Sequence, residues 1–145
     1  MREFDVAIVG AGLAGSIAAT MLARAGHAIA VVDPNKIYPD DFRVEKFAEH
    51  QVRVLRKTGL SEAVLAAATH ERSVWVSMLG RLAEKRESDQ RGFDYGALVN
   101  VLRREMPPSV SQIHAKVVAV ANSPDRQRVT LSTGEGIDAR LVILA

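Results

Sequence analysis

The stretch that decides the fold reads Phe4-Asp5-Val6-Ala7-Ile8-Val9-Gly10-Ala11-Gly12-Leu13-Ala14-Gly15-Ser16 and, after an alanine-rich segment, ends on Val31-Val32-Asp33. Its first apolar run, Val6 to Val9, breaks into three glycines with the spacing G-x-G-x-x-G. A second apolar run follows and ends on an acid. A short strand, a glycine-rich turn, a helix and a second strand are the parts of a βαβ unit. The sequence therefore predicts a parallel sheet that begins with these two strands.

Each residue type in this stretch has a physical role in holding a dinucleotide. Gly10 allows the tight turn from strand to helix, and Gly12 has no Cβ that would keep a pyrophosphate from the backbone. Gly15 lets the helix pack closely against the strands. The phosphates would lie on the free N–H groups of the helix N-terminus, where the helix dipole favours negative charge. We therefore expect the cofactor to be bound by the whole loop, which comprises Gly10, Ala11, Gly12, Leu13, Ala14 and Gly15.

Asp33 ends the second predicted strand and is followed directly by Pro34, in a turn. A carboxylate at this position would accept hydrogen bonds from the hydroxyls of the adenosine ribose. It would also repel a 2′-phosphate, which argues against NADP as the ligand of this unit. We include Asp33 and Pro34 among the expected cofactor-binding residues.

The composition is that of a globular protein. With 145 residues and 48% hydrophobic content the chain can bury a core, and we expect one domain. The net charge is +2 and the basic residues are scattered, so we expect no nucleic-acid partner and no membrane-binding patch. No apolar run approaches the ~20 residues of a transmembrane segment. The simplest expectation is a cytoplasmic protein.

The chain contains no cysteine, which excludes a C-x-x-C redox pair, a thiolate metal site and a cysteine nucleophile. Its four histidines form no H-x-x-x-H pair, and we predict no metal site. Ser16 has no base beside it, and Asp94 is read as a helix cap rather than a general base. Catalytic residues are therefore not assigned.

Beyond the βαβ unit, the hydrophobic spacing predicts helices over 42–57, 61–69 and 95–105, the first capped by Asp40 or Asp41 and the last by Asp94. Aliphatic side chains alternate with other residues around Trp75, and Gly80 follows, which predicts a hairpin. The charged segment 85–92 is expected to be a solvated loop. Trp75 is expected to serve core or interface packing. Strands are predicted over 113–121, 128–132 and 137–145.

On the glycine motif, the acid after the second strand and the β-rich C-terminal part, the chain resembles the N-terminal part of FAD-dependent oxidoreductases. The branch in question contains aromatic-ring hydroxylases similar to para-hydroxybenzoate hydroxylase, and geranylgeranyl reductases and flavin-dependent halogenases share its architecture. The resemblance implies an α/β, Rossmann-like FAD/NAD(P)-binding fold with a parallel sheet, helices and a β-meander. It also implies a monooxygenase or hydroxylase with FAD as cofactor, NAD(P)H as co-substrate and a small organic substrate.

The resemblance adds two cofactor-binding positions. An arginine shortly after the second strand commonly reaches the FAD in such enzymes, and Arg43 is its counterpart here. A backbone segment like Lys116-Val117-Val118 holds adenine in the family, which adds Val118. The helix after Asp94 resembles the one that approaches the flavin side of the pyrophosphate, yet it starts with Tyr95 where many relatives carry arginine or glutamine.

The Gly-Asp block that binds the flavin end of FAD in these relatives does not occur within residues 1–145. The resemblance therefore implies an FAD-binding domain over 1–145 that is incomplete. Two other interpretations remain open. The glycine-rich turn and Asp33 would serve NAD equally well, although a β-meander in place of further βαβ repeats weighs against an NAD-dependent dehydrogenase. The other is a non-catalytic module that binds a dinucleotide or docks a partner.

Overall fold

A six-stranded sheet is built around β1 (Arg2–Val9) in the computed structural model, which describes residues 2–145. β1 pairs in parallel with β2 (Ile29–Val32) on one side and with β9 (Gly136–Leu144) on the other. β6 (Ser111–Ile113) extends the parallel part beyond β2. On the far side of β9, β8 (Gln127–Leu131) and β7 (Val117–Asn122) complete an antiparallel meander. The predicted combination of a parallel sheet with a meander is therefore confirmed, with the strand order β6-β2-β1-β9-β8-β7.

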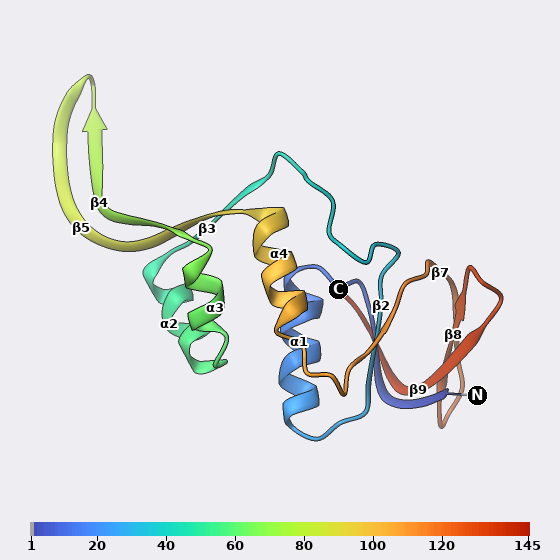
Figure 1. Ribbon diagram of the computed structural model, residues 1–145. Helices are drawn as coiled ribbons and strands as arrows, with labels where there is room; N and C mark the ends of the chain where they lie inside the picture. Colours follow the sequence, from blue (N-terminus) through green and yellow to red (C-terminus); the bar gives the residue numbers. More distant parts are fainter. Residues whose placement is uncertain (1) are drawn as a thin grey trace. The chain divides into compact units, whose positions relative to one another are not determined.

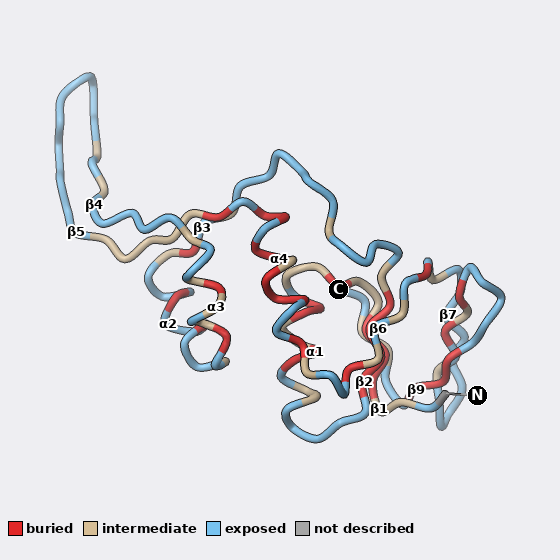
Figure 2. The backbone as a smooth tube through the Cα atoms, in the orientation of Figure 1, coloured by how far each residue is buried: buried red, intermediate tan, exposed pale blue. Residues whose placement is uncertain are grey.

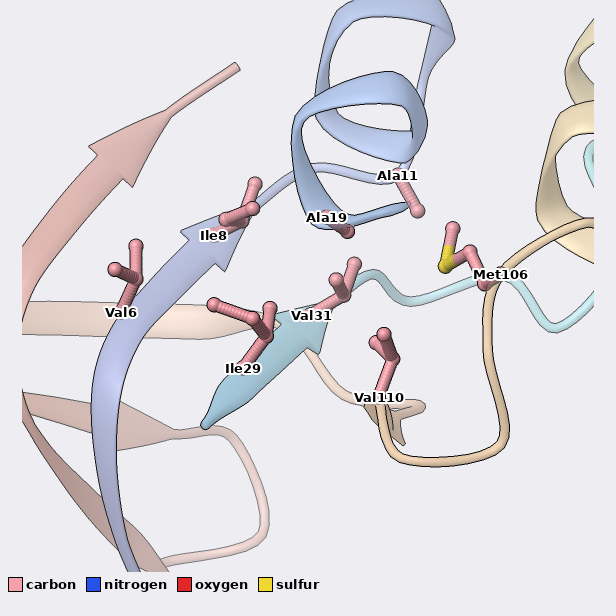
Figure 3. Packing of buried hydrophobic residues seen from close by; sticks show 8 residues of the cluster. All are labelled: Val6, Ile8, Ala11, Ala19, Ile29, Val31, Met106 and Val110. Carbon is pink, nitrogen blue, oxygen red and sulfur yellow. The ribbon is translucent and has the colours of Figure 1, made fainter. Parts of the chain in front are cut away.

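Helix α1 (Leu13–Arg24) covers one face of the parallel strands, and this packing forms the core below the glycine-rich loop. Figure 3 shows side chains of β1 and β2 meeting Ala19 of the helix and Met106 and Val110 from a later segment. Ile8 and Ala19 are fully buried and Val31 is 2% exposed. α1 ends before Gly26, whose φ of +91° is the left-handed conformation that favours glycine. The small residues of α1 thus let the helix lie close to the strands.

The chain forms two compact units. The first contains the six-stranded sheet and α1 and comprises the residues up to Pro39 and from Leu102 onward, whereas the second is Asp40–Val101. α4 (Tyr95–Arg104) begins in the second unit and ends in the first. The second unit also holds α2 (Glu49–Lys57), α3 (Ser61–Ala66) and a three-stranded antiparallel sheet ordered β3-β5-β4, from β3 (Val44–Phe47), β4 (Thr69–Met78) and β5 (Arg81–Asp94).

The predicted helix over 42–57 is wrong in its first half. Residues 44–47 form β3, which pairs with the end of β5, and the helix starts only at Glu49. Neither Asp40 nor Asp41 caps it, because the N-cap is Ala48, whose N–H donates to Gln51 Oε1 at 2.8 Å. Pairing with a distant strand has overridden the local helical spacing. The helix predicted from Asp94 is confirmed, and Asp94 Oδ1 accepts the N–H of Ala97 at 2.9 Å.

The hairpin is longer than predicted. The segment 85–92, expected to be a loop, belongs to β5 and pairs with β4. Figure 1 shows the two strands as one long ribbon that extends beyond α2 and α3, and Figure 2 shows that its outer part is exposed. Charged residues are tolerated in this strand because the surrounding faces are open to solvent. The prediction that Trp75 packs in the core is wrong, since it is 62% exposed and its ring centroid lies 4.7 Å from the Lys85 ammonium, whereas packing in an interface stays a prediction.

The strand predicted over 113–121 is in fact two strands. Its start belongs to β6, which pairs with β2, and its remainder to β7, which pairs with β8. Residues 114–116 connect them. Hydrophobic alternation continues across this connection in the sequence, so periodicity alone does not reveal the break.

Candidate dinucleotide-binding site

The glycine-rich loop joins the carboxyl end of β1 to α1. Gly10 has φ +105°, and its N–H donates to the carbonyl of Val32 at 2.8 Å, which fixes the loop beside the end of β2. A Cβ at Gly10 would overlap the carbonyl oxygen of Ala145, and a Cβ at Gly15 would overlap the carbonyl oxygen of Gly10. Both glycines are therefore required by the fold itself, as the sequence predicts for a tight turn and close helix packing.

Gly12 is different, because its backbone does not require a glycine. It is the N-cap of α1 with φ −72° and ψ −165°, an extended conformation that any residue adopts. Leu13 and Ala14 begin the helix, and Ala14 is exposed. No side chain caps this end of α1, and its first turn carries no acidic residue. The N–H groups of the first turn thus form a site suited to an anion, and the missing side chain at Gly12 keeps the approach to them open.

Asp33 follows β2 and lies against this loop. Its Oδ2 accepts the N–H of Ala11 at 2.9 Å, and its Oδ1 accepts the N–H of Asn35 at 2.9 Å. The second bond closes the turn through Pro34, which is exposed. The Asp33 side chain remains 16% exposed. The structure therefore brings the acid and the loop together, although part of the carboxylate's hydrogen-bonding capacity is used within the chain.

A buried arginine, which sequence reasoning missed, completes this arrangement. Arg103 Nε donates to the carbonyl of Ala11 at 2.8 Å, and its Nη1 donates to the carbonyl of Asn35 at 2.5 Å. Its Nη2 lies 3.1 Å from Asp33 Oδ2 in an ion pair whose alignment falls short of a hydrogen bond. Arg103 is only 7% exposed. The available signal was its position four residues after the buried Val99, which places it on the buried face of α4.

The two positions suggested by the resemblance belong to other elements of the chain. Arg43 belongs to the second unit, where its guanidinium lies 3.9 Å from the ring centroid of Tyr95. Val118 belongs to the first unit, on β7 at the edge of the sheet, and is 62% exposed. It is the extra residue of a β-bulge, because Val117 pairs with Leu131 and Ala119 with Thr130. The bulge removes Val118 from the regular ladder.

The groups considered for catalysis and metal binding in the sequence have structural roles or do not cluster in the described part of the chain. Ser16 is fully buried and its hydroxyl donates to the carbonyl of Ala11 at 3.1 Å, so it stabilises the loop. Within residues 2–145, no group of three or more His, Asp or Glu side chains is placed to hold a metal ion. The same residues contain no helix that is long and apolar enough to cross a membrane.

The fold and this arrangement define a dinucleotide-binding domain of the Rossmann type. The sequence matches the family described as FAD binding domain over residues 3–131, which is most of the chain. The chain therefore belongs to the FAD binding domain family, and its cofactor is FAD. The alternative of an NAD-dependent dehydrogenase is not favoured. No curated protein sequence matches the chain.

Solved structures share the fold at low sequence identity. p-Nitrophenol 4-monooxygenase PnpA from Pseudomonas putida DLL-E4 matches with a TM-score of 0.85 and 18% identity, over 100% of this chain and 41% of PnpA. Tetracycline destructase Tet(51) matches with a TM-score of 0.75 and 18% identity, over 100% of this chain and 38% of Tet(51). The peptidyl tryptophan dihydroxylase QhpG matches with a TM-score of 0.70 and 24% identity, over 99% of this chain and 32% of QhpG. The chain thus spans less than half the length of these proteins.

Proposed function

We propose that this chain is the ADP-binding part of an FAD-dependent monooxygenase that acts on a small organic molecule with NAD(P)H as reductant. The observation that carries the proposal is the uncapped N-terminus of α1, which follows the tight turn at Gly10, together with the Asp33 carboxylate that binds the same loop at Ala11. These groups complement the two ends of an ADP moiety. The N–H groups suit the pyrophosphate, and the carboxylate suits a ribose hydroxyl.

The reaction class is supported by the names of structural relatives. PnpA is named a monooxygenase and QhpG a dihydroxylase, while their names give different substrates. Bound FAD supplies the redox chemistry, and the residues of this chain bind and orient it. In this proposal Val118 offers its backbone to the adenine, and Arg43 contributes a cation to the cofactor. Pro34 shapes the turn that follows the carboxylate.

The binding part of the proposal is tested by titrating the chain with ADP, FAD and NADH in parallel by calorimetry. We expect ADP and FAD to bind. NADH contains the same ADP moiety, so the deciding result is the order of FAD and NADH: a preference for NADH of tenfold or more, about 1.4 kcal/mol, would favour an NAD-binding module instead. Gly12→Val should abolish ADP binding, because its side chain would occupy the place of the pyrophosphate while its backbone stays in an allowed conformation. Unchanged ADP affinity in Gly12→Val would contradict the proposal.

Gly136→Val is the matched control. Gly136 starts β9, and a Cβ there would make only ordinary contacts, none closer than 3.8 Å. This variant should fold and bind ADP as the unmodified chain does. The reaction class is tested separately in a protein that joins this chain to flavin-binding and substrate-binding parts, because the chain by itself is proposed to be the ADP-binding part only; NAD(P)H oxidation and oxygen uptake are followed after loading with FAD. Absence of both with every reductant would contradict a monooxygenase while leaving FAD binding intact.

A further inference from the structure

We propose that Arg103 is a positioning residue of the nucleotide site, which aims the Asp33 carboxylate at the ribose hydroxyls of the ADP moiety. This inference rests on the proposed function, because it assigns a role within the same site. Arg103 comes from the end of α4, far along the chain from the loop and the acid. It nevertheless contacts three consecutive parts of the site, which are the loop at Ala11, the acid Asp33 and the turn at Asn35.

The hydrogen bonds of Arg103 fix the backbone on both sides of the carboxylate. Nε binds the carbonyl of Ala11, whose own N–H is donated to Asp33 Oδ2. Nη1 binds the carbonyl of Asn35, whose own N–H is donated to Asp33 Oδ1. Arg103 therefore holds in place the two residues that hold the carboxylate. A planar guanidinium with five N–H donors suits three acceptors in one arrangement, whereas a lysine ammonium does not.

The same contacts determine which acceptor position Asp33 can offer a ligand. A carboxylate has about four lone-pair positions, two on each oxygen. Oδ2 accepts the Ala11 N–H and faces the Arg103 guanidinium, and Oδ1 accepts the Asn35 N–H. The remaining position is therefore on Oδ1. If the ion pair to Oδ2 were absent, the carboxylate could rotate, and this direction would no longer be fixed.

Arg103 acts through Asp33 rather than by touching the nucleotide. It is 7% exposed, compared with 16% for the Asp33 side chain. The pocket beside Ala11, Asp33 and Arg103 measures only about 10 Å³, close to the volume that one water centre requires. A ribose must therefore approach Asp33 from its exposed side. Arg103 remains behind the carboxylate in such a complex.

The test compares ADP with 2′,3′-dideoxy-ADP, which lacks the hydroxyls that Asp33 would accept. In the unmodified chain we expect ADP to bind at least about tenfold more tightly, as hydrogen bonds to a charged group imply. Arg103→Met should reduce this preference to about threefold or less, because the carboxylate is no longer aimed. If Arg103 had a merely structural role, its substitution would lower the affinity for both nucleotides equally and leave the preference for ADP unchanged.

Arg104→Met is the control, because Arg104 is the next residue of the same helix and is exposed. It should retain the full preference for ADP. Arg103→Lys keeps a cation but not the fork of donors, so we expect it to lose the preference as well, and it decides the matter if Arg103→Met does not fold. Retention of the full preference in the folded Arg103 variants would overturn the inference. Failure of the unmodified chain to bind either nucleotide would instead overturn the proposed function.

Discussion

The guanidinium of Arg43 lies over the ring of Tyr95 at 3.9 Å from its centroid, and the Tyr95 N–H donates to the Arg43 carbonyl at 2.8 Å. Tyr95 stands at the start of α4, where related enzymes commonly carry arginine or glutamine. It is 8% exposed, whereas the Arg43 side chain is 53% exposed. The buried ring therefore supports a cation that solvent can reach. Tyr95 replaces the arginine or glutamine of related enzymes at this position, and its role here is to support the Arg43 guanidinium.

A double-mutant cycle measures this contact. Arg43→Ala and Tyr95→Leu, alone and together, should give a coupling energy of about 0.5–1 kcal/mol in the free energy of unfolding, which is the value of a solvent-exposed cation–π pair. The measurement is chemical denaturation followed by circular dichroism. Tyr95→Phe retains a ring face, so its cycle with Arg43→Ala should show little coupling. A coupling energy of zero for the leucine pair would show that the stacking contributes nothing.

Gly15→Ala should destabilise the chain strongly. The added Cβ would overlap the carbonyl oxygen of Gly10, a backbone atom of the tight turn that cannot move aside cheaply. We expect a loss of about 1–3 kcal/mol. Gly134→Ala is the comparison, because Gly134 has a positive φ of +84° but open space around it. Strain alone should cost about 1 kcal/mol there, so thermal melting of the two variants separates overlap from strain.

Asp33→Ala should lower the stability of the chain as well as its nucleotide affinity. It leaves the Arg103 guanidinium buried without its carboxylate, and breaking such a pair costs about 3 kcal/mol. Removing both charges should lower the stability of the chain less than removing the carboxylate alone. The prediction is that Asp33→Ala combined with Arg103→Met unfolds at a higher denaturant concentration than Asp33→Ala alone. If the stability losses of the two single variants simply added in the double variant, the ion pair would be excluded as their common cause.

The acid stability of the meander should depend on Asp138. Arg128 donates two hydrogen bonds of 2.8 Å to this carboxylate and holds its pKa below the ordinary value of 3.8. The folded chain therefore binds fewer protons than the unfolded chain at acid pH. The stabilisation is fully present above about pH 4 and is lost as the pH falls toward the pKa of the folded state.

This predicts that the melting temperature of Asp138→Asn falls less steeply between about pH 4 and pH 2 than that of the unmodified chain. Glu135→Gln serves as the control, because it removes an exposed carboxylate from the neighbouring turn and leaves the Arg128 pair intact. In the second unit, hydrogen bonding by Arg91 lowers the pKa of Asp89, and this contribution persists in both variants. If the melting temperatures of all three proteins fell equally steeply with pH, the prediction would be contradicted.

The parts that could be predicted from the sequence are those whose reason is local. The G-x-G-x-x-G spacing identifies the turn because one requirement for glycine lies within the motif: a Cβ at Gly15 would overlap the carbonyl oxygen of Gly10. The apolar run of β2 is recognisable because all four of its residues are buried. The loop and Asp33 come together as expected, since both follow the carboxyl ends of adjacent parallel strands.

The parts that could not be predicted depend on pairing across long separations. β3 is specified by its partner β5 rather than by its own residues, which have a helical spacing. The charged run in β5 pairs with β4 although its composition is typical of a loop. The contact of Arg103 with Asp33 joins residues that no local pattern connects. In each case the determining interaction is a tertiary contact, which single-sequence periodicity does not report.

The bulge at Val118 also bears on self-association. β7 is the outer strand of the six-stranded sheet, and an open edge with regularly spaced N–H and C=O groups is a template for another molecule's strand. One additional residue disrupts that spacing and increases the local twist, and the opposite margin, β6, is only three residues long. Both margins are therefore poor templates. A variant that deletes Val118 would straighten the outer strand, and its cost would appear as aggregation rather than as lower stability of the isolated molecule.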